Sequence, residues 1–507
     1  MSSAVFMIFC LVAAGCYGIE EMIPAAGPGM TVIMLIVLPF IWGLPFGLVA
    51  SELGSVRPQE GGYYKWVQEA FGEFWGFQAG WWRTISIYID NTLYVILAGG
   101  YAAGQWGLTP MQEFLLKALM ILIFTAVNLR GVHDVGIAST VLSVIVIGVF
   151  LMAAILGFMN WNGSGIGPLT PEPVSDFGDL LYYIGAGISV GMWMYSGYES
   201  MSTMAGEIEN PQVIPKATLI SVPVIMLTYI FPTVAGLGSV GHWQLWGTEA
   251  NNIGYQTIFA EYAAPALSVV FVIVSILAQC SIYNTYIASG SRGFFALADD
   301  RLAPPILTKC GRKRGVPYVA VLSVAITNLV LCVLPFSTVV VVDVFLLVSS
   351  YILVYFAELK LRKTIPEEEY KFRIPGGSGF LHLLCIVPVC VAVLSFFING
   401  ADYFLGGMIG IATGPVMYFI WKRRYGGLRE SYPQDERTGL AQGDLGRNAL
   451  LSFLMAAIGA AGLIFLPMIE EVPDAIYTAV AVMTAVFAAA GAVSAAVSRK
   501  ISGGINV

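Results

Sequence analysis

Two glycines and two acids interrupt the first apolar run of the sequence, which reads Gly15-Cys16-Tyr17-Gly18-Ile19-Glu20-Glu21. A second apolar run is interrupted in the same way, and it reads Tyr195-Ser196-Gly197-Tyr198-Glu199-Ser200. The backbone groups freed by a break in a membrane helix need partners, so breaks are tolerated where they line a cavity. In the competing interpretation the glycines only let helices pack closely. Two breaks, each beside an acid, favour a cavity between broken helices.

The runs around these breaks belong to a very apolar chain. Of its 507 residues, 57% are hydrophobic and 11% are charged, whereas an average soluble domain has roughly 25% charged residues. The hydrophobic fraction is enough for roughly fourteen membrane-crossing helices of about 20 residues each. This composition excludes a soluble enzyme, a nucleic-acid-binding protein and a disordered scaffold. The sequence therefore predicts an all-α polytopic membrane protein.

Apolar runs separated by Gly, Pro and charged residues predict fourteen spans. They cover about 4–26, 31–54, 75–103, 111–130, 135–159, 178–205, 217–239, 265–292, 317–335, 338–361, 380–399, 401–422, 448–467 and 474–497. Twelve would remain if the last two runs were not true spans. Breaks in spans one and six, each opening a group of five, are typical of a transporter built from inverted five-helix repeats.

This pattern predicts four parts of the chain. They are a ten-helix transport core at 1–361 (repeats at about 4–159 and 178–361), helices eleven and twelve at 362–424, a cytoplasmic linker at 425–447 and two extra C-terminal helices at 448–507. Lys and Arg gather in alternate loops, and the loops around 104–110, 160–177 and 240–262 contain neither. By the positive-inside rule, both termini are expected in the cytoplasm of a protein of the plasma membrane.

Several longer stretches match one known superfamily. Among them are Tyr17-Gly18-Ile19-Glu20-Glu21, Ala26-Gly27-Pro28, Pro39-Phe40-Ile41-Trp42, Glu60-Gly61-Gly62-Tyr63, Phe74-Trp75-Gly76-Phe77, Ile89-Asp90-Asn91 and Ser202-Thr203-Met204-Ala205-Gly206-Glu207-Ile208-Glu209-Asn210-Pro211. Through them, residues 4–424 resemble the amino acid–polyamine–organocation superfamily, and most of all the polyamine uptake transporters of plants and trypanosomatids and their bacterial relatives. The resemblance implies two inverted five-helix repeats with substrate held at the two breaks. It does not extend to the last two spans.

The acids at the breaks indicate a cationic substrate. In an amino acid transporter of this fold, the half-helix after the first break points free amides at the substrate carboxylate. Glu20 and Glu21 stand there instead and would satisfy those amides themselves. Asp90 in span three and Glu199 at the second break add two acids, and acids inside membrane spans usually face a cavity. We therefore expect a secondary transporter that imports polyamines or related cationic amines. The alternative is an amino acid permease or exchanger of the same fold.

Aromatic faces near the breaks complete the predicted site, because each attracts an ammonium group by roughly 0.5–2 kcal/mol. The predicted substrate-binding residues are Gly15, Tyr17, Gly18, Glu20, Asp90, Tyr94, Trp193, Tyr195, Gly197, Tyr198 and Glu199. Other interpretations stay open: Glu20 can cap its half-helix, Glu21 can face the outer vestibule, and the aromatic residues can be interface anchors. Asp343 is expected at the outer vestibule. Arg83 lies two helical turns from Asp90, too far for a direct contact.

A proton is the expected coupling ion of a symporter, with sodium as the alternative. Some proton-coupled members of the superfamily carry a lysine in span five, where this chain has Val146. An acid such as Glu20, Asp90 or Glu199 would then carry the proton. The seven cysteines show no metal-ligand spacing, and we predict no enzyme activity, cofactor, metal or nucleic-acid partner. An amine receptor of the same fold has no support, because the sequence shows no separate signalling domain.

Overall fold

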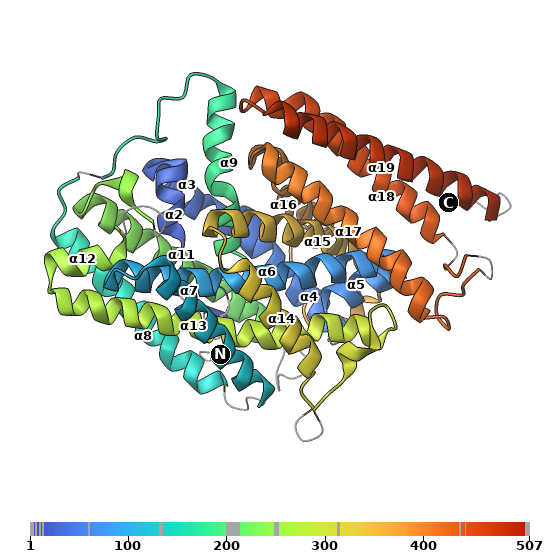
Figure 1. Cartoon of the computed structure of the whole chain (residues 1–507), viewed down its shortest axis with the longest axis horizontal. Coiled ribbons are helices and arrows are strands. Elements are labelled where there is room, and N and C mark those ends of the chain that lie inside the picture. The colour runs from blue at the N-terminus through green and yellow to red at the C-terminus, as the bar shows by residue number, and fades with distance from the viewer. Residues whose placement is uncertain are drawn as a thin grey trace.

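The computed structural model describes 5, 8–9, 12, 15–58, 61–130, 135–163, 165–198, 213–247, 253–311, 315–435, 438–441 and 443–501, with the side chains of 135–140 and 501 left aside. These residues form helices and contain no strand, only three isolated bridges (Figure 1).

The helices follow one another in three groups. The first is α2 (Ile19–Ala26), α3 (Pro28–Leu38), the π-helical η1 (Pro39–Gly43), α4 (Leu44–Val56), α5 (Tyr63–Phe71), α6 (Glu73–Trp106), α7 (Pro110–Leu129) and α8 (Val135–Met159). The second is α9 (Phe177–Met194), α11 (Val213–Ser239), η3 (Trp243–Leu245), α12 (Tyr255–Tyr262), α13 (Pro265–Asp299), η4 (Pro305–Thr308), α14 (Tyr318–Leu331) and α15 (Phe336–Thr364). The third is η5 (Glu367–Glu369), α16 (Gly377–Ile398), α17 (Ala401–Tyr425), α18 (Asp444–Phe465), η6 (Leu466–Met468) and α19 (Asp474–Ile501).

Ten helical segments of the described chain are long and apolar enough to cross a membrane. They are Pro28–Val56, Pro110–Leu129, Val141–Met159, Val213–Ser239, Pro265–Asp299, Phe336–Thr364, Gly377–Ile398, Ala401–Tyr425, Asp444–Met468 and Asp474–Lys500. Each overlaps a predicted span, so the chain is a multi-pass helical membrane protein. The other four predicted spans correspond to α6, α9, the shorter apolar α14, and a first run that lies partly outside the described residues. The count of fourteen and the inverted repeats stay predictions.

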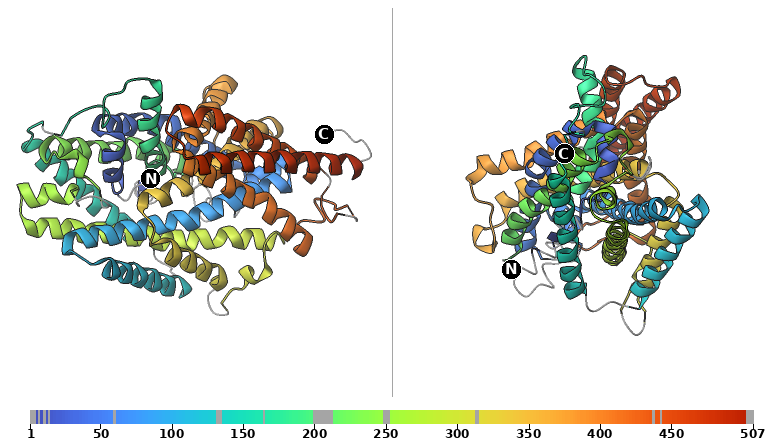
Figure 2. Two further views of the ribbon diagram at one scale, coloured as in Figure 1. Left: turned by 45° about the horizontal axis from the view of Figure 1, so that its top comes forward. Right: turned by 90° about the vertical axis from the view of Figure 1, so that its left-hand side faces the viewer.

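The long helix α6 lies in the middle of the bundle, with α13 and α15 packed along it (Figures 1 and 2). Close packing with α13 depends on small residues: a Cβ atom at Gly290 would lie 2.9 Å from the side chain of Ile87. Glycine at such a point lets two backbones approach within a membrane, where apolar burial gives little preference for protein over lipid. One face of α6 is therefore held toward the interior of the protein.

Both sequence breaks are non-helical in the structure. Residues 15–18 form bends and turns, with Gly15 at φ 119° and Gly18 at φ 92°, and α2 starts directly after them. The chain leaves helical geometry again after α9, with Gly197 at φ 104°. These left-handed values favour glycine because it has no Cβ. The positions of the glycines thus determine where α2 starts and where the chain after α9 turns.

The second break is held against the η1 segment. Trp42 donates its indole N–H to the carbonyl oxygen of Met192 at 3.1 Å and to Ser196 Oγ at 3.2 Å. A π-helical turn inside an α-helical span often marks a functional position. Here it brings a tryptophan to the Met192 carbonyl near the end of α9, which also accepts a hydrogen bond from the Ser196 hydroxyl at 2.7 Å.

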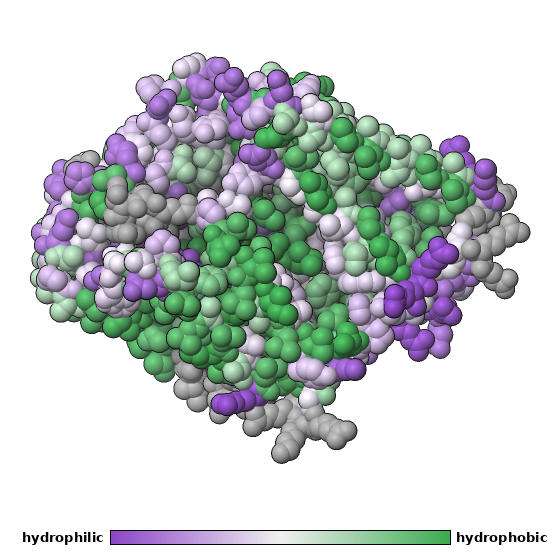
Figure 3. Space-filling model, in the orientation of Figure 1, coloured by the Kyte–Doolittle hydropathy of each residue, from purple (hydrophilic) through white to green (hydrophobic). Residues whose placement is uncertain are grey.

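Hydrophobic residues cover the middle of the molecular face in Figure 3, and hydrophilic residues gather toward its ends. One end of the bundle carries α12, which lies in the region 240–262 that contains no Lys or Arg. The opposite end carries α5 and the start of α18 (Figure 1). Lys and Arg cluster at this second end, which is named the basic end below.

The last two helices form an antiparallel hairpin that packs on α17 (Figure 1). Close contact again depends on glycine: a Cβ at Gly459 of α18 would lie 2.8 Å from the Met408 side chain of α17. At the basic end, Lys422 of α17 forms ion pairs with Glu73 of α6 and Asp444 of α18, and all three side chains are at most 1% exposed. One buried cation therefore joins the hairpin to the rest of the bundle.

Candidate functional site

Glu20 lies in the first turn of α2 and is buried, with 2% of its surface exposed. Its Oε2 accepts a hydrogen bond from the backbone N–H of Gly18 at 3.1 Å, and its Oε1 accepts one from the Tyr101 hydroxyl at 2.6 Å. The capping role considered from the sequence is therefore real. The same carboxylate also reaches across to α6, so capping accounts for only one of its two oxygens.

An aromatic cluster surrounds this carboxylate. The Tyr17 ring packs edge-on against Tyr101, with ring centroids 5.6 Å apart, and against Phe150 of α8 at 5.0 Å. Tyr255 of α12 continues the cluster from Phe150 at 5.4 Å. Aromatic walls around an acid suit an ammonium group, which is attracted both by the carboxylate and by the ring faces.

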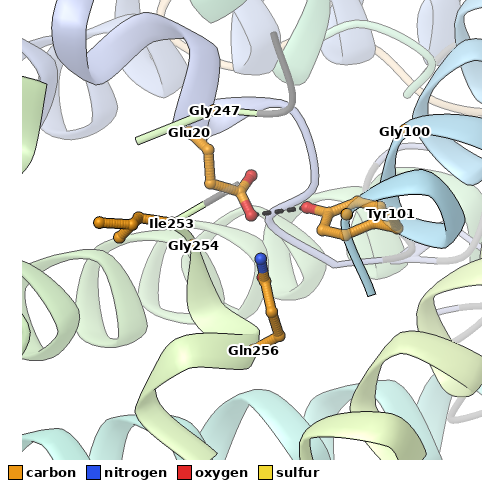
Figure 4. Close-up of a pocket in the computed structure, with 8 residues that line it drawn as sticks. Glu20, Gly100, Tyr101, Gly247, Ile253, Gly254 and Gln256 are labelled. Carbon is orange, nitrogen blue, oxygen red and sulfur yellow. Dashed lines mark hydrogen bonds between the residues drawn. The ribbon is translucent and has the colours of Figure 1, made fainter. Parts of the chain in front are cut away.

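A small cavity beside Glu20 is lined on one side by Gly247, Ile253 and Gly254 (Figure 4). Its volume is about 10 Å³, which is room for roughly one water molecule. A Cβ atom at Gly254 would lie 3.2 Å from Glu20 Oε1, and Gln256 directs its side-chain nitrogen toward the carboxylate. Glu21 is half-buried and approaches the same segment at Gly247. Among the described residues, the cavity at Glu20 has room for about one water molecule and no larger solute.

A second acid, Asp90, lies near the middle of α6 and is 5% exposed. Trp193, near the end of α9, donates its indole N–H to Asp90 Oδ1 at 2.6 Å. The Tyr94 hydroxyl lies 3.5 Å from Asp90 Oδ2. Asp90 thus joins α6 to the second break, as Glu20 joins α6 to the first.

Trp193 also connects the two acids. A Cβ at Gly18 would lie 3.2 Å from the Trp193 ring, so the first break packs directly on the tryptophan that binds Asp90. Tyr94 packs beside Trp193 with ring centroids 5.8 Å apart, and Phe336 lies at 5.5 Å on α15. Both sequence breaks therefore meet at one indole ring.

Asp343 is not at a vestibule, and the expectation that it lines one is wrong. It is 1% exposed on α15 and accepts a hydrogen bond from the Ser86 hydroxyl of α6 at 2.6 Å. Arg83 donates to the same serine at 3.1 Å and lies within electrostatic range of Asp343. The prediction failed because it used only the position of Asp343 along its own span, whereas the packing of α15 on α6 buries the residue.

The remaining predicted residues lie apart from the two acids. The Tyr195 hydroxyl donates to the Leu35 carbonyl of α3 at 2.7 Å, and the Tyr198 ring packs against Gly43 and Gly47. Gly15 packs on Phe150 and Tyr17, and Gly197 provides the turn after α9. Glu199 lies outside the described residues. The structure thus gathers Tyr17, Gly18, Glu20, Asp90, Tyr94 and Trp193 around the breaks and directs Tyr195 and Tyr198 toward the second span.

Tyr101 is the residue that the sequence analysis missed at Glu20. It lies seven positions after Tyr94 and eleven after Asp90, spacings that place all three on one helical face. The same spacing, extended two turns beyond Tyr94, predicts Tyr101 on this face. Among the described residues, no three His, Cys, Asp or Glu side chains are grouped as metal ligands.

Comparison with known proteins places this arrangement in a family. The model of the amino acid permease family matches residues 1–420. The chain belongs to the amino acid permease family. It is similar to a probable polyamine transporter of Arabidopsis thaliana, 30% identical over 84% of this chain and 85% of the relative. It is also similar to the polyamine transporter RMV1 of the same plant, 30% identical over 78% of this chain and 79% of the relative. The serine/threonine exchanger SteT of Bacillus subtilis is 25% identical over 75% of this chain and 86% of the relative.

This permease is therefore a membrane transporter of small molecules and not an enzyme. The family match ends within α17, before the α18–α19 hairpin. The two acids, the breaks and the surrounding aromatic residues all lie in the matched part of the permease.

Proposed function

We propose that this permease imports polyamines or related cationic amines across the plasma membrane by alternating access. The observation that carries the proposal is the hydrogen bond from the Gly18 N–H to Glu20 Oε2 at 3.1 Å. A substrate carboxylate would need such an amide at the start of a half-helix, where the helix dipole attracts negative charge. Glu20 already occupies this amide, so a bound amino acid would lose a donor and meet a like charge.

The second acid supports a substrate with more than one ammonium group. Asp90 and Tyr101, the partner of Glu20, are eleven positions apart on α6, which is about 16 Å at 1.5 Å per residue. Asp90 and the point where Glu20 contacts α6 therefore lie about three helical turns apart along this helix. A linear polyamine extended past Trp193 would bring one ammonium to each acid, while the rings of Tyr17, Tyr94 and Trp193 attract the cationic chain.

The names of the relatives also support a polyamine substrate, since several of the similar proteins are named polyamine transporters or probable polyamine transporters. The alternative is amino acid transport. It is favoured by the similarity to SteT and to the aromatic amino acid transport protein AroP of Escherichia coli, which is 27% identical over 74% of this chain.

The proposed architecture is the transport core at 1–361, two further helices at 362–424, the linker at 425–447 and the hairpin at 448–507. The core would move as two inverted five-helix repeats, with both termini in the cytoplasm. We further propose proton symport, with sodium as the alternative ion. Val146 is buried at the position in span five where some proton-coupled members of the superfamily carry a lysine. Because valine cannot bind a proton, an acid of the site would carry it.

The test is uptake of labelled spermidine by the reconstituted protein under an inward proton gradient, with unlabelled leucine, serine and arginine as competitors. Saturable uptake that leucine and serine leave unchanged is expected. Glu20→Gln and Asp90→Asn should each reduce uptake at least tenfold. Glu172→Gln is the matched control, because it removes an exposed acid outside the membrane spans and should leave uptake within about twofold. Leucine or serine transport without spermidine uptake would replace the proposal with the amino acid alternative.

A further inference from the structure

A second and larger cavity lies at the basic end, far along α6 from the candidate substrate site. Its volume is about 420 Å³. Its walls come from the end of α5, the start of α6, α15, the chain after α17 and the first turn of α18. It therefore lies between the family-matched bundle and the C-terminal hairpin, and nothing in the proposed transport cycle uses it.

Two cationic side chains line this cavity. Lys360 of α15 is exposed and lies over the Phe71 ring, with its ammonium 5.0 Å from the ring centroid. In the described part of the chain its ammonium has no acidic partner within 4 Å. Arg447 of α18 is 35% exposed, and its guanidinium packs beside Gly72, where a Cβ would lie 3.6 Å away. Lys360 can thus reach a ligand in the cavity, and so can Arg447, whose guanidinium also donates to Asp444 Oδ1 at 3.4 Å.

The acids near the cavity are already held by other groups. Glu69 accepts hydrogen bonds from Arg57 at 2.9 and 3.0 Å. Asp444 lies 3.4 Å from Arg447 but is buried, and its Oδ2 accepts from Tyr418 at 2.6 Å and from the Ala441 N–H at 3.0 Å. Glu69 and Asp444 thus each have donors other than the two cavity cations, so an anion in the cavity can still pair with Lys360 and Arg447.

Aromatic side chains form the rest of the wall. Trp75 and Tyr432 line the cavity and are half-buried, and the Tyr432 hydroxyl donates to the Gln68 carbonyl at 3.3 Å. Trp and Tyr are enriched at the level of lipid head groups, and Lys and Arg mark the cytoplasmic side of a membrane protein. Basic pockets between membrane helices on that side bind anionic head groups.

We propose that this cavity binds the phosphate group of an anionic ligand, supplied by a phospholipid of the cytoplasmic leaflet. Lys360 and Arg447 would hold the phosphate, and Trp75 and Tyr432 would pack beside the glycerol part of the lipid. Because Lys360 belongs to the bundle and Arg447 to the hairpin, the bound lipid would link the two. The proposal does not depend on the identity of the transported solute.

The test measures binding of a fluorescent phosphatidylglycerol to the purified full-length protein in detergent, with fluorescent phosphatidylcholine as the neutral probe. We expect preference for phosphatidylglycerol. The double variant Lys360→Gln/Arg447→Gln should weaken this binding at least tenfold, because each Lys or Arg near an anionic membrane surface contributes appreciably to the attraction. Lys360→Gln alone should weaken it severalfold, and this exposed site keeps the variant folded.

The matched control is Lys363→Gln/Arg424→Gln, which removes two exposed cations at the same end that do not line the cavity. It should keep the affinity of the wild-type protein. Equal loss in both double variants, or equal binding of the two lipids, would overturn the site. Displacement of the lipid by glycerol 3-phosphate or inorganic phosphate at similar concentration would assign the cavity to a soluble phosphate instead and overturn the lipid source.

Discussion

Trp193 and Tyr195 are aromatic residues close together at the second break, but they donate hydrogen bonds to different parts of the protein. Trp193 donates to Asp90 at 2.6 Å, whereas Tyr195 donates to the Leu35 carbonyl at 2.7 Å. A hydrogen bond to an ionised group contributes roughly 1.5–3 kcal/mol. The indole N–H therefore fixes the orientation of one carboxylate in the proposed site, and the tyrosine hydroxyl fixes the second span.

This difference predicts opposite outcomes for two conservative substitutions. Trp193→Phe keeps a ring but removes the donor, and it should raise the apparent Kd for spermidine about tenfold. Tyr195→Phe should leave the Kd within about twofold and lower thermal stability instead, because a buried carbonyl loses its donor. Equilibrium binding and thermal unfolding of both variants measure the two effects. If Tyr195→Phe weakened binding as much as Trp193→Phe, the tyrosine would belong to the site.

The separation of Glu20 and Asp90 predicts selectivity by length. Competition against labelled spermidine should be strongest for spermine and spermidine and weakest for putrescine, because Asp90 and the Glu20 partner Tyr101 lie about three helical turns apart along α6, farther than a short diamine extends. In Asp90→Asn, putrescine and spermidine should inhibit uptake more equally, because only one acid then remains to bind an ammonium group. Equal inhibition by all three amines in the wild-type protein would show that a single acid recognises the substrate.

At the level of elements, the close approach of Gly254 to Glu20 makes the closure of the site testable. A Cβ at Gly254 would lie 3.2 Å from Glu20 Oε1 and 2.8 Å from Gln256 Oε1. Gly254→Val should hold the backbone at this position away from Glu20 and reduce the uptake rate about tenfold with little change in spermidine binding, because alternating access requires the site to close. Gly406→Val, at a position with no atom within 4 Å of the added Cβ, is the control. An unchanged rate in Gly254→Val would show that this close approach is not needed for transport.

The elements themselves were largely predictable from the sequence. Ten apolar helices lie where apolar runs were expected, and the glycines of both breaks take the left-handed geometry that ends helical structure. Length, hydropathy and glycine position are local properties, so a single sequence carries them. Tyr101 and Asp343 were not predicted at their observed places, because their environment is set by neighbours on other helices. The hydrogen bonds of Tyr101 with Glu20 and of Ser86 with Asp343 join residues 81 and 257 positions apart.

At the scale of the whole molecule, one buried cation holds the C-terminal hairpin on the bundle. Lys422 pairs with Glu73 and lies 3.4 Å from Asp444, and Glu73 also accepts from the Leu428 N–H at 2.8 Å. The distant α6 and the consecutive helices α17 and α18 thus depend on each other's charges at the basic end. Among the described residues, removing the cation leaves the buried Glu73 carboxylate without a counter-charge, whereas Asp444 keeps only Arg447 at 3.4 Å.

Lys422→Met should therefore destabilise the protein by about 3–5 kcal/mol, the usual loss when one partner of a buried ion pair is removed. The hairpin should loosen first, so trypsin should cut the linker after Arg429 faster than in the wild-type protein, and the melting temperature should fall. Arg424→Met removes an exposed cation two positions later and should change stability by no more than about 0.5 kcal/mol. Adding Glu73→Gln to Lys422→Met should recover part of the loss, because one uncompensated carboxylate is then gone. If Lys422→Met resisted trypsin and heat as well as Arg424→Met, the hairpin would be held by apolar packing with α17 alone.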